Sequence, residues 1–72
     1  MDRETAKEIV DTLEGVNRSI FGLLPRLQQS CSEDEFNKLK REIARISNVI
    51  DMNLYPVVLD QYPELDPLNN NQ

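Results

Sequence analysis

The stretch Ala6–Leu27, "AKEIVDTLEGVNRSIFGLLPRL", decides the fold. Its apolar residues recur alternately three and four positions apart, which is the spacing of a helix that packs against other helices. The members of this series are Ala6, Ile9, Leu13, Val16, Ile20, Leu23 and Leu27. We therefore expect a helix from about Arg3 to about Gln29, with Asp2 as its N-cap.

Two residues oppose a continuous first helix. Gly22 lowers helix stability by about 1 kcal/mol relative to Ala, and Pro25 removes one backbone hydrogen bond. Both fall on the outer side of the helical wheel, where a proline bends a helix around its core. We expect a kink at Pro25; in the alternative, the helix ends near Leu24 and a loose segment follows.

A second helix is indicated by the sequence "SEDE" at Ser32–Glu35, which has the form of a capping box. The apolar residues that follow again alternate three and four apart: Phe36, Leu39, Ile43, Ile46 and Ile50. A short polar connection between two long amphipathic helices predicts an antiparallel helical hairpin.

The stretch Asn53–Leu68, "NLYPVVLDQYPELDPL", holds three of the four prolines and both tyrosines. Either the second helix continues through Pro56 with a kink, or a short third helix begins near Asn53 with Pro56 in its first turn. We expect the later prolines, Pro63 and Pro67, to end regular structure. The predicted domain therefore covers residues 1–62, and residues 63–72 form an irregular or disordered tail.

The composition narrows the ways in which so short a chain is stabilised. It has 72 residues, and a single core of this size supplies roughly 3–5 kcal/mol. Cys31 is the only cysteine and there is no histidine, so neither an internal disulfide nor a Cys/His metal site is expected. No apolar run reaches the length of a membrane span, and the charged N-terminus does not resemble a secretory signal. We expect a cytoplasmic protein without a cofactor.

Association between chains is the remaining source of stability. The sequence predicts an all-α fold: an antiparallel helical hairpin with a short C-terminal helical segment, two copies of which pair into a dimeric four-helix bundle. A monomer covered by its own residues 53–62 and a complex with another protein are the alternatives. The residues predicted to self-associate are Ile9, Val10, Leu13, Val16, Ile20, Leu24, Leu39, Ile43, Ile46 and Ile50.

The function predicted from these features is that of a non-enzymatic protein–protein interaction or regulatory module. Without histidine, and with carboxylates mostly at outer heptad positions, catalysis has little support. The apolar C-terminal segment with its acidic surroundings is a candidate docking surface for a protein partner, formed by Tyr55, Val57, Val58, Leu59 and Tyr62. Alternatively, these residues close the end of the bundle by packing against the first helix.

A second hypothesis is a small nucleic-acid-binding regulator. Lys38, Arg41 and Arg45 follow one another along the second helix as a basic stripe. Against it, the net charge is −5, and from Ser47 onward there are four acidic residues and no basic one. Cys31, in the turn between the helices, is either an inert thiol or a group for an intermolecular disulfide.

The second half of the chain resembles a group of small bacterial helical proteins. The stretch "DEFNKLKREIARISNVI" followed by "IDMNLYPVVLDQYPELDP" is similar to their ending, in which an apolar helix is followed by a proline and a "PELxP"-like close. This resemblance implies a bacterial, cytosolic protein and brings no activity with it. The layout of the hairpin is also similar to that of the Rop-type RNA-binding hairpin dimer, as an architectural likeness without a shared motif.

Overall fold

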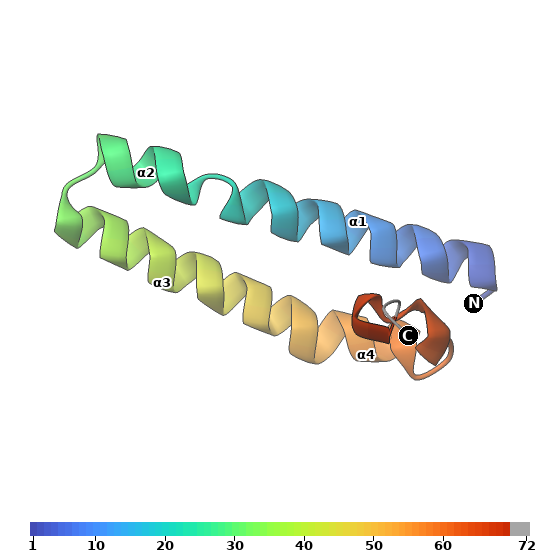
Figure 1. Cartoon of the computed structure of the whole chain (residues 1–72). Helices are drawn as coiled ribbons and strands as arrows, with labels where there is room; N and C mark the ends of the chain where they lie inside the picture. The colour runs from blue at the N-terminus through green and yellow to red at the C-terminus, as the bar shows by residue number, and fades with distance from the viewer. Residues whose placement is uncertain (70–72) are drawn as a thin grey trace.

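The computed structural model describes residues 1–69 and forms an elongated helical hairpin measuring 45 × 21 × 20 Å (Figure 1). Two long limbs run antiparallel, and the described residues contain no strand. The elements in order are α1 (Arg3–Phe21), α2 (Leu24–Ser30), α3 (Glu33–Val49), the π-helical turn η1 (Ile50–Leu54), α4 (Tyr55–Leu59) and the 3₁₀ turns η2 (Pro63–Leu65) and η3 (Pro67–Asn69). The predicted all-α hairpin is confirmed.

Both limbs begin at the predicted caps. The Asp2 carboxylate accepts a hydrogen bond of 2.8 Å from the backbone N–H of Thr5. At the second limb, the Ser32 hydroxyl accepts from the Glu35 N–H at 3.2 Å, and the Glu35 carboxylate accepts from the Ser32 N–H at 3.0 Å. These reciprocal bonds confirm the capping box and satisfy N–H groups that the first helical turn leaves without partners.

The first limb is interrupted at Gly22 and Leu23, so the prediction of one kinked helix from Arg3 to Gln29 is wrong in its interior. The backbone stays in the right-handed helical region, but the Leu23 N–H bonds three residues back, to the Ile20 carbonyl. A proline ring inside a helix clashes with the carbonyl four residues earlier. The interruption places Pro25 in the first turn of α2, where its missing N–H does no harm. The alternative with a loose segment is also wrong, because α2 is helical.

The second limb continues through Pro56 with an unbroken helical backbone, as the first interpretation predicted, and its last helix, α4, carries Pro56 in its first turn, as the second predicted. The α3 helix passes without a break into η1 and α4, and the backbone torsions at both junctions are right-handed helical. Within η1 the bonding changes: the Tyr55 N–H bonds to the Ile50 carbonyl, five residues back. This wider turn adds one residue immediately before the proline, where a regular α-helical turn would bring the ring against a carbonyl.

The π turn also sets which side chains face the first limb. Ile50 is buried, and the next buried residue of this limb is Tyr55, a step of five. In a regular α-helix, five residues turn a side chain by about 140° from its starting direction, so Tyr55 would point away from α1. The extra residue of η1 cancels most of this rotation. It also explains why the predicted apolar series falters at Asn53.

The hydrophobic core lies at the end of the hairpin that carries the N-terminus. The buried cluster consists of Ala6, Val10, Leu13, Ile50, Tyr55 and Val58, and Ile9, Leu59, Tyr62 and Leu65 pack against it. Towards the turn of the hairpin, Ile43 is the only other buried apolar residue among those described. The core therefore occupies one end of a long molecule.

The C-terminal segment is fastened to the start of α1. The Tyr62 hydroxyl donates to the Met1 carbonyl at 2.8 Å, and Arg3 Nε lies 3.4 Å from the Glu64 carboxylate. Pro63 and Pro67 begin short 3₁₀ turns rather than ending all regular structure. Residues 70–72 of the predicted tail lie outside the described residues.

Candidate functional site

The residues predicted to self-associate divide into two groups. Val10, Leu13, Ile43 and Ile50 are buried within the single chain, so they are not available to a second copy in this conformation. Ile9, Ile20 and Leu24 are half-buried. The remaining three keep large exposed fractions, which are 41% for Val16, 40% for Leu39 and 48% for Ile46. The part of the predicted set that is exposed is therefore narrower than expected.

These exposed residues lie on one side of the hairpin. Between the limbs, the Ser47 hydroxyl donates to the Asn17 side-chain oxygen at 3.4 Å, which joins the two limbs. Val16 and Ile46 each precede one of these residues. Because the limbs are antiparallel helices, stepping back one residue on each turns both side chains towards the same side of the pair. Val16 and Ile46 therefore share one side of the hairpin, turned away from the contact between the limbs.

We call this side the open face and define it by Ile9, Val16, Ile20, Leu23, Leu39 and Ile46. On the first limb it carries a shallow hollow lined only by uncharged residues, which are Thr12, Gly15, Val16, Ser19, Ile20 and Leu23. Leu23, which the predicted set omitted, is almost half exposed. An apolar strip along both limbs of so small a domain is typical of an association surface.

The candidate docking residues of the C-terminal segment are mostly internal. Tyr55 and Val58 belong to the core, and Leu59 and Tyr62 are half-buried against it. Only Val57 is well exposed, with 57% of its surface accessible. The segment therefore closes the end of the hairpin, as the alternative interpretation held. The π turn is the reason, because it rotates Tyr55 and Val58 towards α1.

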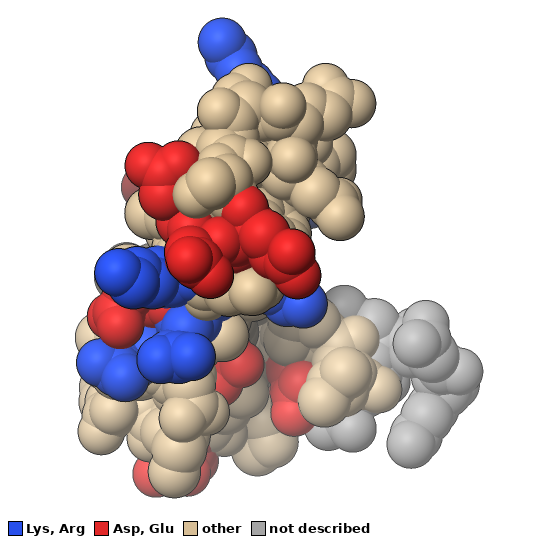
Figure 2. All heavy atoms as spheres, turned by 90° about the vertical axis from the view of Figure 1, so that its left-hand side faces the viewer, with Lys and Arg blue, Asp and Glu red and all other residues tan. Residues whose placement is uncertain are grey.

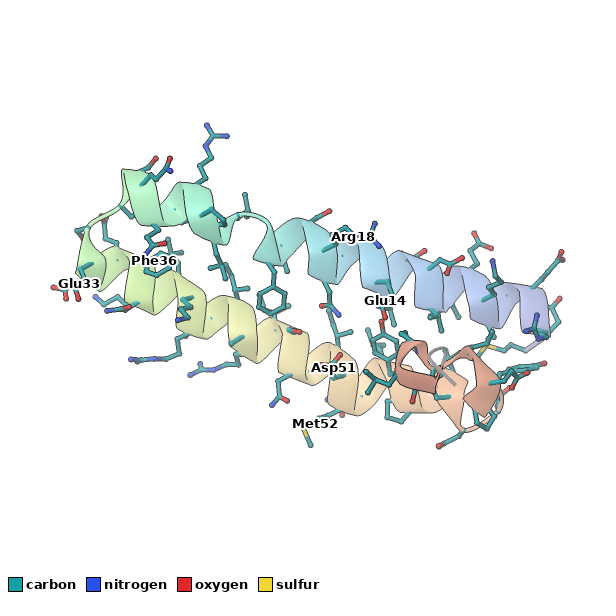
Figure 3. The ribbon with its side chains drawn as sticks, viewed as in Figure 1. Glu14, Arg18, Glu33, Phe36, Asp51 and Met52 are labelled. Carbon is teal, nitrogen blue, oxygen red and sulfur yellow. The ribbon has the colours of Figure 1, made fainter. Side chains whose placement is uncertain are left out.

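Two exposed apolar residues near this segment were missed from the sequence. Met52 is 67% exposed and points away from α1 in Figure 3, and Leu54 is about half exposed. Both belong to η1. The five-residue step from Ile50 to Tyr55 in the apolar series was the sequence signal that could have predicted their exposure.

The basic stripe does not form an uninterrupted positive surface. Lys38, Arg41 and Arg45 are exposed, but Arg45 pairs with the Glu42 carboxylate at 3.3 Å. The helix α3 holds four acidic and four basic residues, so it has no net charge. Figure 2, which looks onto the turn of the hairpin, shows the two signs side by side. This arrangement does not favour a nucleic-acid backbone.

A hollow of about 420 Å³ lies between α1, η1 and the C-terminal turns, and we call it the acidic hollow. Its lining residues are Glu14, Asn17, Asp51, Tyr55, Leu59, Asp66, Pro67 and Leu68. Figure 3 shows Glu14 and Asp51 on opposite limbs, facing the space between them. No basic residue is among the lining residues.

The Tyr55 hydroxyl is the most unusual group in this hollow. Tyr55 is only 7% exposed, and its buried hydroxyl makes no hydrogen bond of ordinary geometry among the described residues, although the Glu14 carboxylate lies close enough to act on it as an acceptor. Burial raises the pKa of this hydroxyl to about 12, the Glu14 carboxylate adds to the effect through its negative charge and as a hydrogen-bond acceptor, and the charges of Asp51 and Asp66 contribute less. The hydroxyl therefore stays a neutral donor throughout the ordinary pH range.

Cys31 is half-buried where α2 ends, and its backbone N–H bonds to the Leu27 carbonyl at 2.9 Å. Within residues 1–69, no group of three or more His, Cys, Asp or Glu side chains is arranged to hold a metal ion. None of the helices described is both long enough and apolar enough to cross a membrane.

Comparison of the chain with protein-family models, with curated proteins and with solved structures finds no match. We therefore infer the function from the open face defined above.

Proposed function

We propose that this chain is a non-enzymatic interaction module that self-associates through its open face, forming a dimeric four-helix bundle. The observation that carries the proposal is the exposure of Val16, Leu39 and Ile46 on one side of the hairpin. Each belongs to the apolar series that would ordinarily form the core of a helical bundle. Covering them with a second copy removes this apolar surface from water.

The shape of the chain supports this proposal. A compact chain of this length has a radius of gyration of about 11 Å. The hairpin has a radius of gyration of 14.8 Å, because one helix lies beside the other and little lies above or below them towards the turn. A second hairpin placed against the open face supplies the missing layer.

A second copy of the chain is better placed to cover the open face than the C-terminal segment is. That segment already packs against the first turns of α1 through Tyr62 and Glu64, and both residues are held there by side-chain contacts to Met1 and Arg3. It cannot also extend along the open face. A two-fold axis lets the same apolar strip serve both partners, which is the commonest symmetry among soluble oligomers.

The mass of the full chain in solution tests the proposal. Light scattering or sedimentation should give twice the 8.4 kDa of one chain. Ile46→Glu places a charge on the open face, and we expect it to weaken the dimer at least about a hundredfold, so that the variant sediments as a single chain. Circular dichroism checks that the variant remains helical.

Asn48→Glu is the matched control, because Asn48 is exposed on the same helix but outside the open face. It adds the same charge and should leave the dimer intact. Should Ile46→Glu fail to fold, Leu39→Glu provides the same test, because it places a charge on the open face one heptad earlier. A single-chain mass for the unmodified protein at every concentration tested contradicts the proposal.

A further inference from the structure

The charged side chains of the hairpin are divided unevenly along its long axis. The Asn17–Ser47 contact divides the antiparallel limbs into two halves, which we call the core half (residues 1–16 and 48–69) and the turn half (residues 17–47). The core half carries nine acidic and two basic side chains, a net charge of −7. The turn half carries four acidic and six basic side chains, a net charge of +2.

The open face runs across both halves. On the first limb, Ile9 and Leu23 each lie seven residues from Val16, so the apolar strip extends equally far on either side of Val16. Such a strip fits a second copy in two orientations. In the parallel orientation the turns of the two hairpins lie at the same end of the dimer, and in the antiparallel orientation they lie at opposite ends. The apolar surface alone does not choose between them.

The distribution of charge favours one of these orientations. In the parallel orientation the two core halves, each with a net charge of −7, lie against each other. In the antiparallel orientation each core half lies against a turn half, whose net charge is +2. At about 0.1 M salt, exposed charges more than about 10 Å apart are largely screened, so the facing halves outweigh those at opposite ends of a 45 Å molecule. Like charges that face each other across an interface are costly, and opposite charges fix how two surfaces pair.

We propose that two copies pair in the antiparallel orientation, with the turn half of each copy covering the core half of the other. This orientation depends on the proposed self-association through the open face. The two-fold axis then crosses the long axis near Val16 and brings α1 against α1 of the partner subunit. Ile9 of one copy meets Leu23 of the partner subunit. In the parallel orientation, α1 would lie against α3 of the second copy instead.

The antiparallel orientation also decides between the two roles considered for Cys31. Cys31 lies where α2 ends, at the turn of the hairpin. The two turns lie at opposite ends of the antiparallel dimer, whereas the sulfur atoms of a disulfide are about 2 Å apart. Cys31 therefore stays a free thiol within the dimer.

Pulsed electron spin resonance of the full chain with a nitroxide label on Cys31 tests the orientation. Antiparallel pairing predicts a distance between the two labels comparable with the 45 Å length of the hairpin, and parallel pairing predicts one comparable with its 20 Å width. Mixed dimers, with one copy labelled at Cys31 and the other at Val57→Cys in a Cys31→Ser background, should show the short distance instead. Because Cys31 is half-buried, Ser30→Cys in the same background moves the label to an exposed neighbour if the first label disturbs the fold.

Two charge reversals separate the effect of orientation from that of overall charge. Lys38→Glu and Lys7→Glu each change the net charge of the chain from −5 to −7. Lys38 belongs to the turn half, and its reversal removes the net positive charge of that half. We expect it to weaken the dimer roughly three- to tenfold at about 0.1 M salt, as measured by sedimentation. Lys7 belongs to the core half, which faces a positive half, so its reversal should change the affinity by less than about twofold.

The outcomes separate the orientation of the dimer from its existence. A dimer mass together with a short distance between the two Cys31 labels overturns the antiparallel orientation and leaves the dimer itself standing. The same holds if Lys7→Glu weakens the dimer as much as Lys38→Glu does. A single-chain mass at every concentration overturns both the orientation and the proposed self-association.

Discussion

At the scale of single residues, the two tyrosines give opposite expectations for the same substitution. The Tyr62 hydroxyl donates to the Met1 carbonyl at 2.8 Å, whereas the buried Tyr55 hydroxyl makes no hydrogen bond of ordinary geometry among the described residues. Tyr62→Phe loses a hydrogen bond and should lower the free energy of unfolding by about 1 kcal/mol. Tyr55→Phe removes an unsatisfied group and should raise it by about 1 kcal/mol. Urea unfolding at one fixed protein concentration measures both, and a loss of stability in Tyr55→Phe would show that the hydroxyl has a partner.

The raised pKa of Tyr55 predicts a loss of stability in alkali. A hydroxyl whose pKa is about 12 in the folded chain and about 10 when unfolded holds its proton more tightly in the folded state. The stability is therefore fully present below pH 10 and falls as the pH rises from 10 to 12. Absorbance of tyrosinate should show this late ionisation, and Tyr55→Phe should remove it. An unchanged titration in that variant contradicts the assignment.

The capping box at the start of α3 yields a prediction that rests on one side chain. Ser32→Ala removes the acceptor for the Glu35 N–H and should lower the free energy of unfolding by about 1 kcal/mol. Ser30→Ala, at the exposed end of α2, is the control and should change stability by less than about 0.5 kcal/mol. Thermal unfolding followed by circular dichroism compares the two. Equal effects would mean that the cap contributes nothing specific.

At the scale of elements, the π turn η1 both keeps the register of the core and makes room for the Pro56 ring. A deletion separates these two effects. Deleting Asn53 from η1 restores α-helical spacing between Ile50 and Tyr55, so the core register is kept, but it brings the Pro56 ring against a carbonyl at a cost of about 3 kcal/mol. Combining the deletion with Pro56→Ala removes this clash. We therefore expect urea unfolding to show a destabilised single deletion and a combined variant that recovers most of the stability.

Deletion of Asn48 in the same Pro56→Ala background is the control. Asn48 is also exposed, but it lies in the regular helix α3, so its loss rotates the side chains on one side of the deletion by about 100° relative to those on the other. This control should lose its cooperative unfolding. If the two deletions behave alike, η1 does not set the register of the core.

The elements also show which parts of the fold the sequence could predict. Local rules were sufficient for the capping box at Ser32 and for the apolar spacing of α1 and α3, because each depends on neighbours along one helix. They failed at Gly22, where both predictions treated Pro25 as the point of change, while the backbone adjusts two residues earlier to make room for the ring. They also failed to predict which side chains after Ile50 are exposed, because the single extra residue in η1 changes the direction in which the later side chains point.

The acidic hollow could not be predicted for a different reason. Glu14 and Asp66 are far apart in the sequence and line the same hollow only because the C-terminal segment returns to α1. That return depends on contacts such as Arg3 with Glu64, which no helical periodicity encodes. The acidic character of the segment was predicted, but not that it lines a hollow together with a residue of the first helix.

At the scale of the whole molecule, the position of the core makes the C-terminal segment a structural part of the domain. A chain that ends at Asp51 loses Tyr55 and Val58, and burial of each contributes about 1.5–3 kcal/mol. Together these match the roughly 3–5 kcal/mol that a single core of this size supplies. We therefore expect the truncated chain to lose cooperative thermal unfolding and most of its helical signal at 25 °C. A chain that ends at Asn69 keeps every contact described above and should unfold like the full chain. If the chain ending at Asp51 instead unfolds cooperatively as a dimer, the open face supplies the stability that we assign to the Tyr55–Val58 end.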